Sequence, residues 1–163
     1  MPDDIPQSDT QPTDMEGVIK LAKYVTWPND PQMSKATIMI APKSDETYMS
    51  ALKLAQNRKI LDAVIELKKI ELTDEALNET DIIFIESGSS IDIDKIIKDV
   101  AERQILTITN DVSIFEKGCM FYVKQDQETG RTDYLYNKDV LLTSRLRINS
   151  SILMPAHKYE KQH

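Results

Sequence analysis

The chain has 163 residues, of which 40% are hydrophobic and only four are glycine, a composition typical of one folded globular domain rather than a disordered or fibrous chain. Its formal net charge is −7, and its lysines and arginines form no cluster. This argues against a nucleic-acid partner, because phosphate binding needs a concentrated excess of positive charge. No apolar stretch approaches the roughly 20 residues that a membrane-spanning helix needs.

The first 13 residues are polar and rich in proline, which predicts a disordered linker over residues 1–13. They lack the charged and apolar regions of a signal peptide, so the chain is read either as cytoplasmic or as starting after its signal. Thr13 and Glu16 have the spacing of a capping box, which predicts that ordered structure begins there. Apolar residues at helical spacing then predict a first helix over residues 14–26, ended by Pro28.

Short apolar runs alternate with amphipathic segments through the middle of the chain. Ser44 or Asp45 is expected to cap one helix, and Ser89 has capping-box spacing to Asp92 before another. Alternation of this kind predicts a mostly parallel sheet with right-handed crossovers. The predicted strands are residues 36–41, 64–67, 82–85 and 105–108, and the helices follow Ser44, lie near 73–77, lie over 93–101 and run from Asn110 to Gly118.

The pattern changes after Gly118, where residues 119–124 and 131–136 both look like strands and are joined only by a polar loop. This arrangement predicts an antiparallel hairpin at one end of the sheet, followed by a helix over 138–144 and a short apolar segment at 152–154. The predicted fold is therefore α/β, a three-layer sandwich with a six-stranded, mostly parallel sheet that ends in an antiparallel hairpin.

Ligands of open parallel sheets bind beyond the carboxyl ends of the strands, and the turn at Ser87, Gly88 and Ser89 follows the third predicted strand. Its backbone amides could hold an anion at a helix N-terminus, although helix capping explains the same residues. The sequence has no dinucleotide-binding or phosphate-loop glycine motif.

Catalysis and metal binding are not expected. Both histidines, His157 and His163, lie near the C-terminus, and no acid, histidine or serine is spaced to form a catalytic group with Cys119. Because Cys119 is the single cysteine, an internal disulfide is excluded, and the apolar residues after it predict a buried strand position. We expect no enzyme activity, no cofactor and no metal.

Aromatic residues are the best candidates for a contact surface, because exposed tyrosine and tryptophan contribute much of the energy of protein interfaces. Tyr122, Tyr134 and Tyr136 lie on the final hairpin, whose last strand we expect to be a sheet edge; the alternative is that helices cover them. Trp27 either packs in the core or lines a pocket.

Six segments taken in order resemble a known family: LAKYVTWP at residues 21–28, DIIFI at 81–85, ILTITN at 105–110, FEKGCM at 115–120, YLYN at 134–137 and LRINSSIL at 146–153. Their order and spacing over residues 15–157 are similar to the YfiR-like family of small bacterial periplasmic regulators. The chain departs from that pattern in having Cys119 where the family commonly has a second glycine, and YLYN where it often has FEIN. Some members carry cysteine pairs, which this chain lacks.

The resemblance implies a single YfiR-like α/β domain over residues 14–157 with a polar tail over 158–163, a periplasmic location with a signal peptide outside the given sequence, and compatibility with a homodimer. It further implies a non-catalytic regulator that binds and restrains a membrane-bound signalling protein, such as a diguanylate cyclase. The alternative is a ligand-sensing input domain for a small molecule. The expected partner-binding residues are Tyr122, Tyr134, Tyr136 and Asn137, and the expected ligand-binding residues are Ser87, Gly88, Ser89 and Trp27.

Overall fold

In the computed structural model, the described residues are 14–101, 103–126, 128–129, 131–149, 151 and, for the backbone alone, 157–159. The predictions for the linker, for Thr13 and for the apolar segment at 152–154 lie outside these residues.

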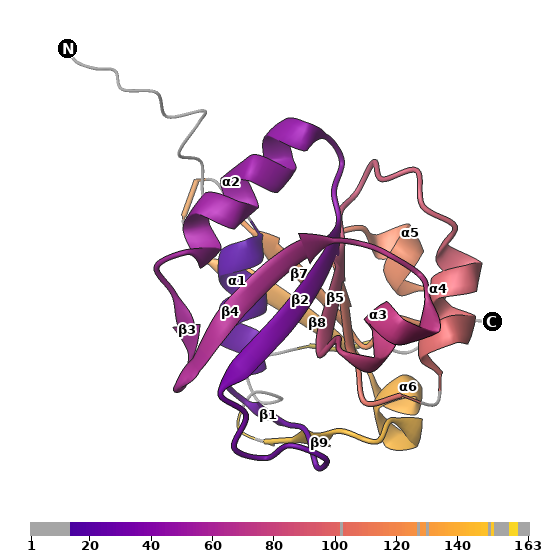
Figure 1. The fold of residues 1–163 in the computed structure, drawn as a ribbon. Coiled ribbons are helices and arrows are strands. Elements are labelled where there is room, and N and C mark those ends of the chain that lie inside the picture. Colours follow the sequence, from indigo (N-terminus) through magenta and orange to yellow (C-terminus); the bar gives the residue numbers. More distant parts are fainter. Residues whose placement is uncertain are drawn as a thin grey trace.

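The body is built on a sheet of eight strands in the order β10-β8-β7-β6-β5-β2-β4-β3 (Figure 1). Neighbouring strands are parallel except for the antiparallel pairs β7–β8 and β3–β4. A separate two-stranded antiparallel sheet joins β1 and β9. The strands are β1 (Val25–Thr26), β2 (Lys35–Ala41), β3 (Lys59–Ile60), β4 (Ala63–Lys69), β5 (Ile82–Ile85), β6 (Leu106–Thr109), β7 (Phe121–Gln125), β8 (Thr132–Asn137), β9 (Arg147–Ile148) and β10 (His157–Tyr159).

All six predicted strands are present, as β2, β4, β5, β6, β7 and β8, but the predicted six-stranded sheet is wrong in its extent. β3 adds an antiparallel strand beyond β4, and β10 adds a parallel strand beyond β8. Both additions are short and are held by backbone pairing with a neighbouring strand, so they leave no period-2 apolar pattern to find in the sequence. Lys158 and Tyr159, expected in the tail, pair with Tyr136 and Asn137.

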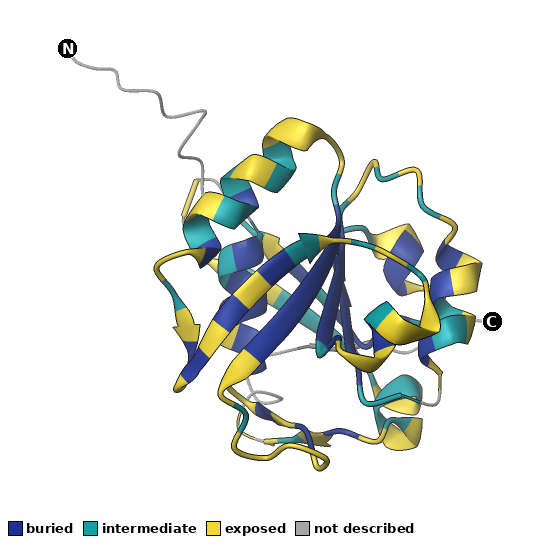
Figure 2. Ribbon diagram, in the orientation of Figure 1, coloured by how far each residue is buried: buried dark blue, intermediate teal, exposed yellow. Residues whose placement is uncertain are grey.

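Helices cover both faces of the sheet (Figure 1). Because side chains alternate along a strand, Ile38 and Ile40 of β2 face a core cluster with α1 and α2, whereas Met39 and Ala41 face a second cluster with α3, α4 and α5. The central strands are buried on both sides, as expected of parallel strands between helices (Figure 2). The helices are α1 (Met15–Ala22), α2 (Asp45–Ala55), α3 (Asp74–Asn78), α4 (Ile93–Val100), α5 (Val112–Phe115) and α6 (Lys138–Thr143).

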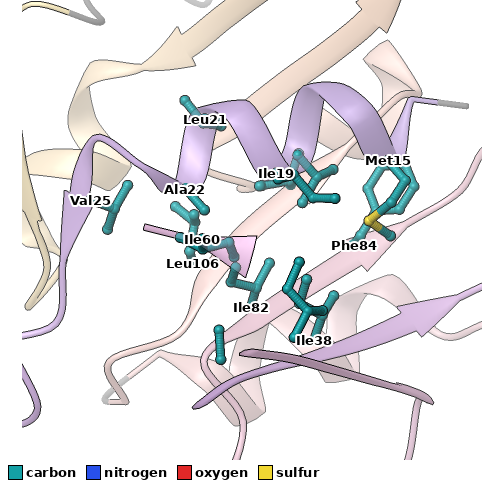
Figure 3. Close-up of a cluster of buried hydrophobic side chains, with 14 of the residues drawn as sticks. Met15, Ile19, Leu21, Ala22, Val25, Ile38, Ile60, Ile82, Phe84 and Leu106 are labelled. Carbon is teal, nitrogen blue, oxygen red and sulfur yellow. The ribbon is translucent and has the colours of Figure 1, made fainter. Parts of the chain in front are cut away.

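Helix α1 is almost wholly enclosed. Met15 and Ile19 pack with Ile38 and Phe84 of the sheet, and Leu21, drawn on the other side of the helix, is also fully buried (Figure 3). A methyl group at Gly17 would lie 3.0 Å from the Thr132 side chain, so the helix also touches the final hairpin closely.

The predicted length of the first helix is wrong, because α1 ends at Ala22 and Val25–Thr26 form β1 instead. The apolar spacing continues to Val25, but its backbone pairs with Ile148 of β9, and the amide of Asn149 donates to the carbonyl of Tyr24 at 2.7 Å. A long-range backbone pairing therefore overrides the local helical period.

Two predicted helix starts have different outcomes. Ser44 caps α2, and its hydroxyl accepts from the Thr47 amide at 3.2 Å in a capping box. The predicted cap at Ser89 is wrong: Asp92 is the N-cap of α4, and its carboxylate accepts from the Lys95 amide at 3.2 Å. Residues 89–91 are used instead to lead the chain from the turn into the helix.

The enclosed core gives a first testable contrast. We expect Phe84→Ala to destabilise the fold by about 3–5 kcal/mol, because it removes a fully buried ring and leaves a cavity. Met49→Ala, at a residue 59% exposed on α2, should change stability by no more than about 0.5 kcal/mol. Urea unfolding measures the stability of both variants. A similar loss of stability in the two would show that Phe84 is not part of the main core.

Candidate functional site

Two neighbouring hollows lie at the amino ends of the parallel strands. The larger, of about 750 Å³, is bounded by the starts of β2, β5 and β6 and by the end of α3. The smaller, of about 430 Å³, lies beside it against the end of α1 and the β3–β4 turn. Trp27 and Asp30 line both, so we call them the polar hollow and the apolar groove of one site. These hollows are therefore at the edge opposite the one where open parallel sheets usually bind ligands.

Asp81 positions one wall of the polar hollow. It directly precedes β5, and its carboxylate accepts a hydrogen bond from the backbone amide of Thr37 at 2.9 Å. Its backbone carbonyl accepts from the indole Nε1 of Trp27 at 3.0 Å and from the amide of Leu106 at 2.9 Å. The site therefore joins three separate segments through a single residue.

Trp27, expected either in the core or beside a pocket, does both. Its side chain is only 4% exposed and belongs to the core cluster of α1, yet it lines both hollows. The Nε1 bond to Asp81 satisfies the buried indole donor, as the burial of a tryptophan requires.

The charges of the polar hollow are unevenly compensated. Lys35 pairs with Glu66 at 2.9 Å, and Arg103 pairs with Asp74 at 2.9 Å and also bonds Asn78. Burial raises the pKa of the Asp81 carboxyl and outweighs the lowering effect of the Thr37 amide; the charge of Asp30 raises this pKa and the charge of Lys35 lowers it.

The predicted serine turn is closed by bonds within the chain. The Ser87 amide donates to Asn110 Oδ1 at 2.7 Å, and its hydroxyl donates to a carboxylate oxygen of Asp111 at 3.0 Å. Gly88 has φ of +90°, a conformation that favours glycine, and the Ser89 hydroxyl accepts from the Ile91 amide at 3.4 Å. An anion at this turn would have to displace these acceptors. Anion binding by the turn therefore stays a prediction, and the alternative is that the same residues only stabilise the turn.

The tyrosines of the hairpin lie on two different faces. Tyr122 is opposite Leu135 and its ring centroid is 6.3 Å from that of Phe115, in the cluster with α5. Tyr134 and Tyr136 point to the other face, opposite Val123 and Phe121, and pack at the border of the α1 cluster.

The expected edge position of β8 is wrong, because β10 pairs along it as the outer strand. Asn137 caps α6, with its Oδ1 accepting from the Val140 amide at 3.2 Å. The three hairpin tyrosines are each half-buried, and those on the α1 face, Tyr134 and Tyr136, form the pair that could act together.

Within the described part of the chain, no group of three or more histidine, cysteine, aspartate or glutamate side chains is placed to hold a metal. No helix among the same residues is long and apolar enough to cross a bilayer. The polar hollow is lined by carboxylates and by the cations Lys35, Arg103 and Arg145, and one indole separates it from the groove.

The residues that sequence reasoning missed are Asp30 and Asp81. The signal for Asp81 was present, since a lone acid stands directly before a fully apolar strand, where no solvated helix face explains it. Asp30 carried no such signal, because it lies in a loop whose path depends on the β1–β9 pairing.

The fold defines a small α/β domain with helices on both faces of a mixed sheet. The sequence profile of the YfiR/HmsC-like family matches residues 14–157, and the chain belongs to this family. The resemblance drawn from the six sequence segments is thereby confirmed. No curated protein matches the chain.

The fold is similar to the crystal structure of a conserved domain protein from Vibrio cholerae, with a TM-score of 0.59 and 13% sequence identity. The match covers 90% of this chain and 60% of the Vibrio protein, so this chain spans well under the whole length of that protein. At this identity the likeness bears on the fold alone.

The raised pKa of Asp81 predicts how stability depends on pH. A carboxyl whose pKa is raised in the folded state stabilises the fold when protonated, and that contribution is lost as pH rises through the folded pKa. We therefore expect Asp81→Asn, which stays neutral and can still accept from Thr37, to be more stable than the parent at pH 7. The difference should shrink as pH falls toward 3.8, the ordinary value.

Glu16→Gln is the matched control, because Arg58 bonds Glu16 through two 2.6 Å contacts and lowers its pKa. This variant should be less stable than the parent at pH 7, with the loss fading as pH falls through the lowered pKa. Urea unfolding across the pH range measures both variants. Parallel pH profiles for Asp81→Asn and the parent would contradict the assignment.

Cys119 is buried as predicted, though it lies just before β7 rather than within it, and burial raises the pKa of its thiol to about 12. The thiolate, which is the reactive form, is therefore scarce at neutral pH. We expect a thiol reagent such as Ellman's reagent to label Cys119 at least about tenfold more slowly in the native protein than in urea. Equal labelling rates in the native and the unfolded protein would show that the segment before β7 opens readily.

Proposed function

We propose that this chain is a non-catalytic periplasmic regulatory protein that binds and restrains a membrane-bound signalling protein, such as a diguanylate cyclase. Membership of the YfiR/HmsC-like family supports the general part of this proposal, a regulatory protein of signalling. The observation that carries the contact surface is the pair of half-buried tyrosines, Tyr134 and Tyr136, on the α1 face of the final hairpin.

These tyrosines have the properties of interface anchors. Each ring is fixed by packing against the core on one side while part of it stays accessible, so little side-chain entropy remains to be lost on binding. Burial raises the pKa of the Tyr134 phenol, and the phenol of nearby Tyr24, which is 38% exposed, raises it further.

The helix after the hairpin extends this surface. Val140 and Leu141 of α6 pack toward the core, whereas Leu142 is 73% exposed. Leu142 thus lies exposed on the helix that directly follows the tyrosine-bearing strand, and we include it in the proposed surface. Tyr122 lies on the opposite face of the sheet and Asn137 caps α6, so the proposed surface is centred on Tyr134 and Tyr136.

The test uses co-expression with the membrane-bound diguanylate cyclases of the native genome, with the chain exported to the periplasm. We expect the parent to lower cellular cyclic di-GMP and to be captured with one cyclase by cross-linking. The double variant Tyr134→Ala and Tyr136→Ala should lose at least about tenfold in capture, since removal of interface anchors costs about 2 kcal/mol or more.

Tyr48→Ala is the matched control, because Tyr48 is also half-buried against the same core cluster but lies on α2, over β4. It should lose comparable stability while keeping capture, and circular dichroism checks both folds. Capture that survives in the double variant, or that fails equally in the control, would remove the hairpin from the contact surface.

A second candidate function is a ligand-sensing input domain, favoured by the polar hollow of about 750 Å³, which lies in the range of small-molecule sites. Stabilisation of the chain by one member of a metabolite panel in a thermal-shift screen would support it. A panel with no stabilising member would count against it.

A further inference from the structure

Helix α1 is buried on most of its circumference, and what it exposes is a narrow stripe. Its apolar residues are fully buried, whereas Glu16 is half-buried and Lys20, Lys23 and Tyr24 are exposed. These four residues stand at positions i, i+4, i+7 and i+8, so they follow one face of the helix and of the turn that ends it. We call them the α1 stripe.

The α1 stripe borders the surface proposed for the partner. A methyl group at Gly17 would lie 3.0 Å from the side chain of Thr132, which stands two residues before Tyr134 on the same face of β8. After burial, the nearby charges of Tyr24 and Glu16 are what raise the pKa of the Tyr134 phenol. The stripe and the two hairpin tyrosines therefore form one continuous surface.

The charge of the α1 stripe is positive. Its single acid, Glu16, is held by Arg58 through two 2.6 Å contacts, so these two charges offset each other. Neither Lys20 nor Lys23 forms an ion pair with a described residue. The surface around the tyrosines thus keeps both lysine charges, although the chain as a whole has a formal net charge of −7.

Strand β9 brings a further cation to the end of the stripe. The amide of Asn149 donates to the carbonyl of Tyr24 at 2.7 Å, so β9 runs beside the last residue of the stripe. Arg147 of β9 is paired with Thr26, and both residues are exposed. Within the described chain Arg147 forms no ion pair either.

Helix stability alone would explain part of this pattern. A lysine in the last turn of a helix interacts favourably with the helix dipole, and Lys20 has that position in α1. The dipole does not account for the aromatic neighbours, since Tyr24 is 38% exposed and Tyr134 and Tyr136 are half-buried. Charges around an aromatic centre are typical of the rim of a protein interface, where they select partners of the opposite charge.

We infer that the partner segment that docks on Tyr134 and Tyr136 is acidic, with carboxylates that meet Lys20, Lys23 and Arg147 at the rim. The inference rests on the proposed regulatory function and names the chemistry of its partner. An anionic bilayer fits the same surface less well, because lipid-binding patches usually cluster about four to eight cations. A flat bilayer would also face the acidic remainder of the chain, whereas a protein segment contacts the surface alone.

Three fluorescein-labelled peptides test this chemistry without requiring the native partner. They share one leucine and one phenylalanine, and their remaining positions hold glutamate, glutamine or lysine. By fluorescence anisotropy at low salt, we expect the whole chain to bind the glutamate peptide about tenfold more tightly than the glutamine peptide, because each exposed ion pair contributes up to about 1 kcal/mol. The lysine peptide should bind most weakly, and added salt should reduce the difference.

Charge reversal locates the contact. The double variant Lys20→Glu and Lys23→Glu should weaken binding of the glutamate peptide by about tenfold. The control is Lys98→Glu with Lys117→Glu, an equal change of net charge at exposed positions on the side of α4 and α5. Lys98 is the basic residue in the last turn of α4, as Lys20 is in α1, so the effect on the helix dipole is matched. The control should change binding by less than about twofold.

Equal binding of the three peptides, or an equal loss in the lysine variant and its control, would overturn the inference. Binding to phosphatidylglycerol vesicles that Lys20→Glu and Lys23→Glu abolish, without a preference for the glutamate peptide, would assign the stripe to lipid instead. In the cyclase assay the lysine variant should also lose about tenfold in capture. If the tyrosine variant loses capture and the lysine variant keeps it, the regulatory function stands and the acidic partner class fails; if both keep it, the proposed surface fails as well.

Discussion

The hydrogen bonds of Asp81 are the constraint on which the amino end of the molecule depends. Its amide and carboxylate bond the backbone of Thr37 in β2, and its carbonyl accepts from Leu106 of β6 and from the indole of Trp27. Through Trp27 the same residue fixes the end of β1 and the loop that follows it. Without this junction the loop would have no fixed position against the sheet, and neither hollow would have two walls.

Polar side chains at the two ends of the parallel sheet differ in how they are paired. At the carboxyl end the chain satisfies itself: Asp14 accepts from the side chain of Asn110 and from the amide of Gln125, both at 2.7 Å, and Asn110 in turn accepts from Ser87. At the amino end Asp30, Glu79 and Asp81 line the polar hollow and form no ion pair among the described residues. Open parallel sheets usually bind ligands beyond the carboxyl ends of their strands, and here the hollow lies at the other edge.

Much of the fold could be predicted from sequence because its main elements are locally encoded. The fully apolar strand β5 was predicted at its observed bounds, and Ser44 with Thr47 forms the cap that its position suggested. What could not be predicted depends on distant backbone partners. β1 and β9 are two residues each and exist only because they pair, and that pairing shortened the first helix.

The site was predictable only where residue type and local sequence decide it. Trp27 was identified as a candidate from its residue type, but its neighbours Asp30 and Asp81 come together only through the path of the β1–β2 loop. Tyr134 and Tyr136 were identified as aromatic residues of the final hairpin, and in the structure both lie on the same face of β8. The sequence could not reveal that Tyr122 faces the other way, because the facing of one strand relative to its neighbour is set by register.

The surface proposed for a partner and the site proposed for a ligand are joined by one continuous element. α1 touches Thr132 of the hairpin through Gly17 at one point, and its end leads through β1 to Trp27. Contiguity of this kind is not itself coupling, which requires that both sites bias the same two-state element. The β1–β9 pair lies between the two places in the chain, because β1 precedes Trp27 while β9 follows α6. It is therefore the element in which a coupling between them would have to be sought.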